Sequence, residues 1–251
     1  MAAATIDQVL LRLNDIIDQS LRDADRVGYF VSLYARVTSN VRRAIIAGGV
    51  FEDNARMERL DVVFANRFLE AYDQFKAGQH PTQSWQVCFL VLDDKDALVL
   101  QHLLLGMNAH INLDLGIAAA EIAEDKAGLA SLRNDFLQIN KVLSRLVDVV
   151  KVELAEVSPR IGQLERFGPA LQEHIFDFGM AAARDGAWGL AERLIAAPKA
   201  DWPAIIAAQD DLIANLGRAL YPLRGPASLA ADWIRDEEST NVRMNIQVIA
   251  S

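Results

Sequence analysis

Histidine, aspartate and asparagine interrupt the most apolar stretch of the chain, residues 97–120. His110 and Asp114 are four residues apart, which places both on one face of a helix. An imidazole beside a carboxylate can bind a divalent metal, or act as a base whose tautomer the carboxylate fixes. Asn108 and Asn112 form a second polar pair on another face. Their amides can bind a carbonyl or hydroxyl group of a substrate.

These polar groups need partners, because the helix that carries them is expected to be buried. Leu, Val, Ile and Met occur on every side of residues 97–120, so no wide face is left for water. A buried polar group without a partner costs about 1–3 kcal/mol, and an unpaired charge costs more. Gly106 and His102 continue the row of His110, and the glycine is expected to leave space beside it. We therefore expect water, a metal ion, a ligand or other side chains at this row.

Candidate partners lie on other helices, where polar residues are set among apolar ones. Asp61 is the first of them, because its place in the apolar pattern should point its carboxylate toward the core. Arg184 can neutralise Asp61 or Asp114, or hold an anionic substrate, and Trp188 can line a pocket beside it. Further candidates, weaker or further round their helices, are Asn66, Arg67, His174 and Asp177.

Helical spacing of apolar residues dominates the elements that must position these side chains. Apolar residues recur at three and four along most of the chain, so the pattern predicts an all-α protein, a multi-helix bundle around the buried central helix. Glycine and proline mark most of the helix ends. The expected helices are about 5–21, 26–47, 53–77, 82–92, 97–123, 130–157, 168–197 and 201–220.

The C-terminal residues change period. Val242, Met244, Ile246 and Val248 alternate with polar residues, which predicts a short extended segment. Such a strand would pair with an internal strand or with a second copy of the chain as a homo-oligomer; the alternative is a frayed tail. We divide the chain into a helical domain, 1–222, and a linker with a C-terminal tail, 223–251, that packs on the domain or on a partner chain.

Composition limits the function further. The chain has 251 residues, 52% of them hydrophobic, and a net charge of -9, which repels phosphate backbones and makes nucleic acid an unexpected partner. One cysteine, Cys88, fits a reducing compartment, and with no signal-peptide pattern at the N-terminus it predicts a cytoplasmic protein. The polar residues within 97–120 argue against a membrane span. No nucleotide-binding loop or nucleophile elbow is present in the sequence.

Several strings resemble a known family. LLLGMNAHINLDLGIA, MERLDVVFANRFLEAYD and RDGAW resemble an uncharacterised bacterial family of all-helical proteins, a domain of unknown function with the core M-N-A-H-I-N-x-D. The resemblance covers most of the chain up to about Leu220 and implies no reaction. His110 and Asp114 are also distantly similar to the His-x-x-x-Asp element of the zinc-dependent phospholipase C and nuclease P1 group. That group uses further histidines, and with four in this chain a trinuclear zinc site is not expected.

Three hypotheses follow for the polar row. In the first, a satisfied polar network only fixes helix register. In the second, His110, Asp114 and Asp61, with His102, bind zinc, manganese or iron, and the metal activates water to hydrolyse an ester or phosphoester. In the third, His110 moves a proton without metal in an isomerisation, cyclisation or elimination of a small molecule. The competing class is a binding or scaffold protein that holds an apolar ligand unchanged.

Overall fold

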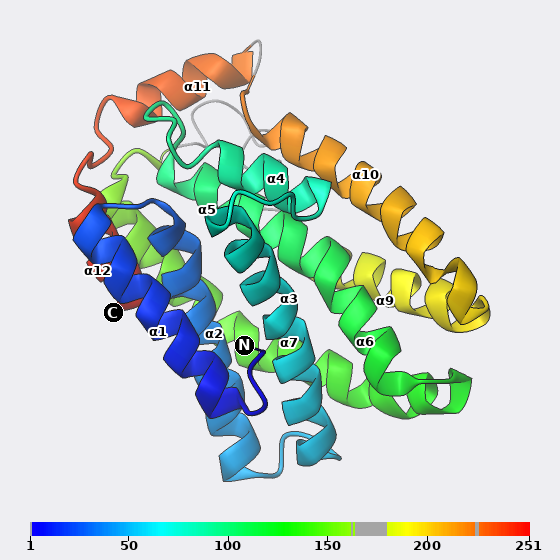
Figure 1. Cartoon of the computed structure of the whole chain (residues 1–251). Coiled ribbons are helices and arrows are strands. Elements are labelled where there is room, and N and C mark those ends of the chain that lie inside the picture. The colour runs from blue at the N-terminus through cyan, green and yellow to red at the C-terminus, as the bar shows by residue number, and fades with distance from the viewer. Residues whose placement is uncertain (1, 162, 164–179, 224–225) are drawn as a thin grey trace.

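The computed structural model describes the chain except for residues 1, 162, 164–179 and 224–225, and the side chains of residues 140–149, 180–181 and 226–227. The described residues form helices and no strand, which confirms the all-α prediction (Figure 1). The helices are α1 (Ile6–Asp23), α2 (Val27–Ala47), α3 (Asn54–Lys76), α4 (Gln83–Leu90), α5 (Val99–Ala109), α6 (Leu115–Ala123), α7 (Lys126–Val157), α9 (Met180–Ala196), α10 (Trp202–Leu220), α11 (Pro226–Arg235) and α12 (Val242–Ala250).

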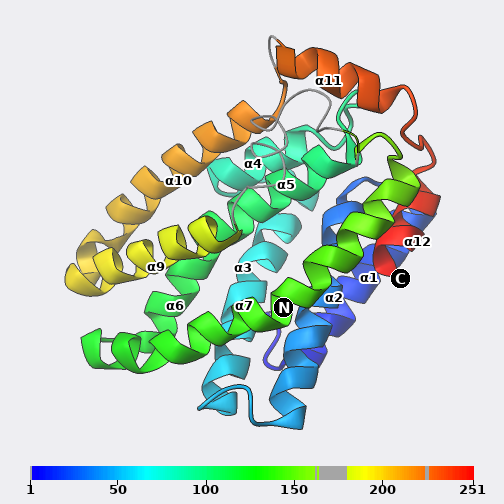
Figure 2. The same ribbon diagram turned by 180° about the vertical axis from the view of Figure 1, so that it is seen from behind.

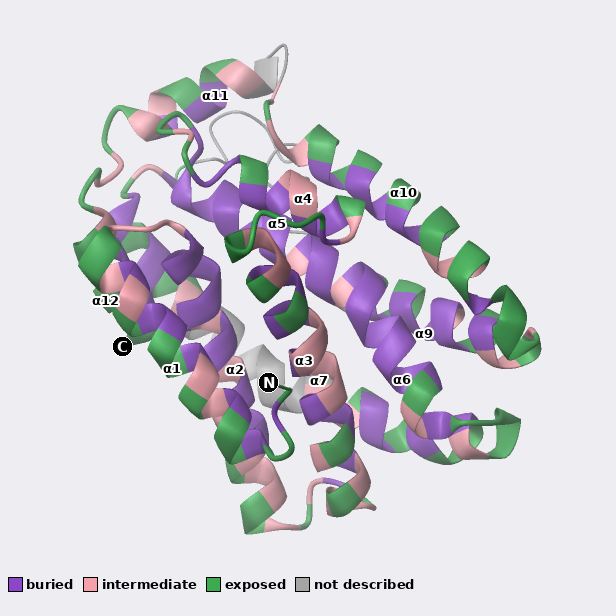
Figure 3. Ribbon diagram, viewed as in Figure 1, coloured by how far each residue is buried: buried purple, intermediate pink, exposed green. Residues whose placement is uncertain are grey.

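The central helix is the continuous unit of α5, a π-helical turn at His110–Asp114, and α6. It is buried along nearly its whole length, as predicted (Figure 3). The α5 half packs against α2, α4 and α10, and the α6 half packs against α3, α7 and α9. In the described part of the chain, Val99–Ala123 is the one helix long and apolar enough to cross a bilayer, and 89% of its most apolar window is buried within the fold.

Two apolar cores lie along this central helix. The first contains Phe68 and Trp85 and joins α5 to α1, α2, α3 and α4. The second contains Leu113, Leu132 and Phe136 and joins α6 to α7 and α9. Figure 2 shows α7 crossing in front of α2, and its contacts with α6, α9, α2 and α12 link the two halves of the molecule. The π-turn lies at the junction of the two cores.

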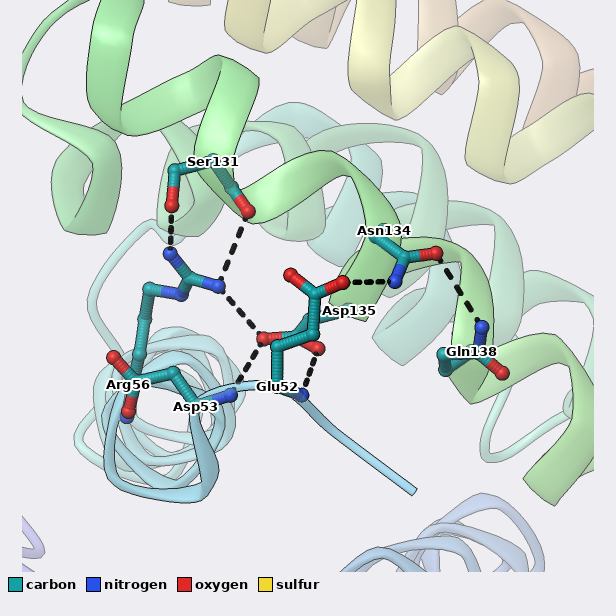
Figure 4. A network of polar contacts seen from close by, with 7 residues as sticks. All are labelled: Glu52, Asp53, Arg56, Ser131, Asn134, Asp135 and Gln138. Carbon is teal, nitrogen blue, oxygen red and sulfur yellow. Dashed lines mark hydrogen bonds and ion pairs between the residues drawn. The ribbon is translucent and has the colours of Figure 1, made fainter. Parts of the chain in front are cut away.

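A buried carboxylate fixes the start of α3. Asp135 of α7 is fully buried and accepts hydrogen bonds from the backbone amides of Glu52 and Asp53, at 2.6 and 3.1 Å (Figure 4). The guanidinium of Arg56 pairs with the same carboxylate at 2.7 Å and also contacts Ser131. Because every oxygen of Asp135 has a partner, this network is structural. It holds α3, whose next turns face the central helix.

The prediction of an extended C-terminal segment is wrong. Residues Val242–Ala250 form α12, which packs on α1, α2 and α7. The side chain of Asn241 caps the helix by accepting a hydrogen bond from the Met244 amide. The residues that α12 buries, Asn245, Ile246 and Ile249, recur with helical spacing. The apparent period of two arose because partly exposed apolar residues occupy the other faces of this short helix.

Candidate functional site

The π-turn sets the orientation of the predicted dyad. Within it the backbone amide of Leu115 donates to the carbonyl of His110, five residues back, so the helix is locally wider than an α-helix. Such turns are rare and are often found at functional sites. The side chains of His110 and Asp114 face each other across the turn, with 3.1 Å between Nδ1 and Oδ2. Both side chains are almost fully buried, at 3% and 1% exposure.

Asp114 is held by two further donors. Trp85 Nε1 donates to Oδ2 at 2.9 Å, and Arg67 Nε donates to Oδ1 at 3.0 Å. A carboxylate that pairs with a guanidinium is an acceptor, so Nδ1 of His110 must carry the hydrogen in their bond. The neutral imidazole then has its lone pair on Nε2. This is the arrangement of a general base whose tautomer is fixed by an acid.

The Nε2 atom of His110 is buried and has no hydrogen-bond partner among the described residues. The ring lies in an aromatic box. Phe64 stacks face to face on it, with 3.6 Å between centroids, and Tyr34 packs on it edge to face, with 4.5 Å between centroids. The other walls of the box are Phe30, Phe68 and Trp85. Burial lowers the pKa of His110, while Asp114 acts in the opposite direction, so the ring is held neutral.

Three more buried polar groups accompany this box. The hydroxyls of Tyr34 and Thr38, one turn apart on α2, are buried close to each other, and Oδ2 of Asp61 has no hydrogen-bond partner among the described residues. Burial raises the pKa of Tyr34, and the Asp61 charge raises it further, so Asp61 lies within electrostatic reach of the Tyr34 hydroxyl. Burial, with the charge of Glu58, raises the pKa of Asp61 to about 7. Asp61 is thus an acid that can hold its proton near neutral pH.

Of the two candidate arginines, Arg67 and not Arg184 lies at the dyad. The ion pair of Asp114 is made by Arg67, which the sequence pattern had placed further round α3. Arg184 lies at the contact of α7 and α9, where its guanidinium stacks on the Phe136 ring at 4.4 Å and donates to the Phe136 carbonyl. Asp61 makes no ion pair with a described residue. Its predicted place near the core is correct, but it does not bond directly to His110 or Asp114.

Asn108 and Asn112 belong to a separate hydrogen-bonded contact between the central helix and α10. Asn108 donates to the Ile213 carbonyl at 2.9 Å, and its own oxygen accepts from Asn112 at 3.0 Å. Gln209 donates to the Asn112 carbonyl at 3.4 Å and accepts from Arg193. These bonds join the central helix to α10 and α9. The asparagines therefore stabilise packing on the far side of the helix from the aromatic box, and do not line it.

Two other predicted site residues also lie elsewhere. Trp188 packs edge to face on Phe136 and donates to Glu192 at 2.9 Å, so it belongs to the second apolar core. His102 is two helical turns before His110, about 12 Å along the axis at 1.5 Å per residue, and packs on Tyr29. His174 and Asp177 lie outside the described residues.

The predicted metal ligands do not converge. Among the described residues there is no group of three or more histidine, cysteine, aspartate or glutamate side chains that could hold a metal ion. His102 is too far from His110, and both oxygens of Asp114 are occupied by Arg67, Trp85 and His110. A metal at this dyad would have to break an ion pair that is already formed. The donor set fits a metal-free site better.

The sequence pattern indicates Arg67 only as a weaker candidate, and it does not single out Trp85, Tyr34 or Thr38 as site residues. One signal was available: Tyr34 and Thr38 are hydroxyl residues four apart on a buried face, the same spacing that identified His110 and Asp114. No sequence signal distinguishes Arg67 from Arg184, because the choice depends on how α3 is rotated about its axis.

The space expected beside Gly106 is filled by an aromatic ring. A Cβ atom built on Gly106 would lie 2.4 Å from Cδ2 of Phe30, which is a wall of the box. Glycine therefore lets Phe30 approach the central helix and His110.

Gly106→Ala should lower the free energy of unfolding by about 2 kcal/mol, because overpacking a buried ring contact forces the neighbours apart. Urea denaturation followed by circular dichroism measures this change. Gly186→Ala is the matched control on α9, since no described atom lies within 4 Å of its Cβ position, and it should stabilise by about 0.5–1 kcal/mol. A Gly106→Ala protein as stable as the wild type would contradict the packing of Phe30.

An all-helical protein with a buried histidine–aspartate dyad at a π-turn of its central helix is the class that this fold and site define. Within that class, the chain belongs to a family of unknown function (DUF5995), whose model matches residues 6–222. This confirms the predicted resemblance to a domain of unknown function. Neither the curated proteins nor the solved structures include a significant match to the chain.

Proposed function

We propose that the protein is a metal-free acid–base enzyme acting on a small molecule, with His110 as the general base. The observation that carries the proposal is the state of the His110 ring. Its Nδ1 is fixed by Asp114, while its Nε2 is buried, neutral and without a partner among the described residues. An unsatisfied buried acceptor costs about 1–3 kcal/mol, and a protein that needed only helix register would gain stability by removing it.

A proton donor is available close to the same ring. Tyr34 packs against His110, and Asp61 can hold a proton near pH 7 because burial raises its pKa to about 7. A base and an acid on one substrate suit proton abstraction and return, as in an isomerisation, cyclisation or elimination. In such a step Nε2 of His110 takes a proton from the substrate, and the Tyr34 hydroxyl or the Asp61 carboxyl returns one.

The walls of the box favour a substrate with an apolar body. Four of its five rings, Phe30, Tyr34, Phe68 and Trp85, are buried, and Phe64 is partly exposed. Entry to His110 therefore requires movement of Phe64, the ring that covers the face of the imidazole. A small apolar molecule with one polar reacting group would replace Phe64 as the neighbour of His110.

The other hypotheses have less support at this site. Hydrolysis of an ester or phosphoester by zinc, manganese or iron would need ligands that the described residues do not bring together. A scaffold that holds an apolar ligand explains the aromatic box but not the orienting bonds to Asp114. Cytoplasmic location and the absence of nucleic-acid and membrane partners remain part of the proposal, consistent with the net charge of -9.

The test is metabolite turnover in deuterated water. Purified protein, dialysed against EDTA, is incubated in D2O with a mixture of small metabolites, and mass spectrometry records compounds that are lost, isomerised or labelled. We expect wild-type protein to convert or label at least one compound, and His110→Phe, which keeps a ring of similar size, to lose the effect by about 100-fold or more.

The stability of His110→Phe gives the second result. If the dyad serves catalysis, this variant should be as stable as the wild type within about 1 kcal/mol, because the unpartnered Nε2 is removed together with one hydrogen bond. A loss of more than about 3 kcal/mol, together with no turnover by the wild type, would instead support a purely structural network. Turnover that EDTA abolishes and zinc restores would support the metal hypothesis.

A further inference from the structure

A second group of buried polar atoms lies at the beginning of α5, away from the aromatic box. His102 is 2% exposed, and neither of its ring nitrogens has a hydrogen-bond partner among the described residues. The ring of Tyr29, from α2, lies edge to face against it with 5.6 Å between centroids. Burial lowers the pKa of His102 to about 3, so this ring is neutral in the folded protein. The proposed reaction uses none of these groups.

Glu238 reaches this group from the loop between α11 and α12. Its Oε2 accepts a hydrogen bond at 3.0 Å from the backbone amide of Val99, the first residue of α5. Its Oε1 is buried and lies close to the buried hydroxyl of Ser158, at the end of α7. The amides of a first helical turn have no partner within the helix, so the side chain of Glu238 completes the start of α5.

The residues after Glu238 are fastened on both sides of this contact. The Ser239 amide donates to the Val157 carbonyl at 2.7 Å. The side-chain amide of Asn245, on α12, donates from Nδ2 to the Ser239 carbonyl at 2.8 Å and to the Tyr29 hydroxyl at 3.4 Å. A Cβ atom at Gly28 would lie 2.6 Å from Cδ1 of Ile246, so α12 fits closely onto α2. The family match ends at residue 222, so Glu238, Ser239 and α12 lie outside it, and they pack on helices that lie inside it.

We propose that residues 236–250 form a pH-sensitive latch, in which protonated Glu238 holds the loop before α12 on the beginning of α5, and so keeps α12 docked on α1, α2 and α7, and ionised Glu238 weakens that docking. The geometry supplies one backbone anchor, the Val99 amide, and places the neutral hydroxyl of Ser158 beside the other carboxyl oxygen. A buried carboxylate in such surroundings loses its hydration without gaining a full counter-charge. The docked segment therefore favours the proton, and the released segment, in water, does not.

The groups around Glu238 leave its pKa raised in the docked state. Tyr29 faces it from α2 and Arg235 from α11, while Arg26 and Asp94 act on the neighbouring His102. Burial raises the pKa of Glu238 from 4.5 to about 7, although the Val99 amide, Ser158 and Arg235 act to lower it. Because the docked pKa is the higher one, docking is strongest at low pH and is lost as the pH rises from about 4.5 to about 7.

His102 would have the opposite effect on the pH dependence of docking if release of the segment exposed its ring to water. Its docked pKa of about 3 is below the usual value of 6.5, so its protonation would favour release at low pH. A comparison between wild type and Glu238→Gln removes this effect, because His102 is present in both. The glutamine keeps an oxygen for the Val99 amide and cannot ionise.

Hydrogen exchange of the full chain tests the latch. Opening constants for amides of Asn245–Ile249 are measured at pH 5.5 and 7.5 and corrected for the intrinsic exchange rate, and α3 amides in the same samples report global unfolding. We expect the ratio of wild-type to Glu238→Gln opening constants to rise on the order of tenfold between these pH values. Glu238→Ala, which removes the anchor, should open α12 faster at both pH values. A ratio that stays constant, or α12 amides that exchange only with α3 in every variant, would overturn the proposal.

Discussion

Asp61→Asn should raise the free energy of unfolding at pH 8 by about 3 kcal/mol, an unusually large gain for one substitution. The carboxyl of Asp61 is buried, has an unpartnered oxygen among the described groups, and has its pKa raised to about 7. Each unit of pKa shift corresponds to about 1.4 kcal/mol, and relaxation of the folded state reduces the sum. Asparagine has nearly the same shape and cannot ionise, so the penalty disappears.

The sign of this effect depends on pH. Folding raises the pKa of Asp61 above its ordinary value of 3.8, so its unfavourable contribution is absent below about pH 4, grows up to about pH 7 and is constant above that. Denaturant titrations at pH 4 and pH 8 should therefore give a gain only at pH 8. Glu70→Gln, an exposed acid on the same helix, is the matched control and should change stability by less than about 0.5 kcal/mol. Equal stability of wild type and Asp61→Asn at pH 8 would show that Asp61 is well solvated or paired.

Asp114→Ala should lower the free energy of unfolding by about 4 kcal/mol. The carboxylate of Asp114 accepts hydrogen bonds from Arg67, Trp85 and His110, and its removal leaves two buried donors and the half-buried guanidinium of Arg67 without this partner. Breaking one side of a buried ion pair typically costs about 3–5 kcal/mol, because the remaining charge stays desolvated. Urea denaturation at pH 7.5 measures the loss.

Glu121→Gln is the control for the Asp114 experiment. Glu121 lies on the same helix and also faces Arg67, at 4.0 Å, but its side chain is 44% exposed. An exposed pair contributes less than about 1 kcal/mol, so this variant should be nearly as stable as the wild type. If Asp114→Ala cost no more than Glu121→Gln, the dyad would not be the anchor of the central helix that its hydrogen bonds describe.

Much of the fold could be predicted from the sequence because the spacing of apolar residues indicates which faces of a helix are buried. Residues 97–123 are apolar on all sides, and the segment is the central helix. The His110 and Asp114 contact followed from their spacing of four, which places two side chains on one helix face whatever the rest of the fold does. Local geometry of this kind needs no knowledge of the neighbouring helices.

The residues that complete the site could not be predicted in the same way. Arg67 and Arg184 are both arginines in apolar surroundings, and the choice between them depends on the rotation of α3 and α9 about their axes. The periodicity of a helix defines which face is buried only to within about one residue, or 100 degrees. The short α12 gave a further error because nine residues hold too few turns to separate a period of two from a period of 3.6.

The π-turn has a consequence for how variants of this chain can differ in length. The turn holds one residue more than an α-helix would need, and its wider five-residue hydrogen bond accommodates that residue without rotating α6 against α5. Deleting Ile111 would allow the backbone to return to a regular α-helix, with the side chains after it facing nearly the same neighbours. The same deletion in the regular part of α5 would rotate every later side chain by about 100 degrees and turn Asp114 away from Arg67. The π-turn is therefore the place in the central helix where the loss of one residue disturbs the packing least.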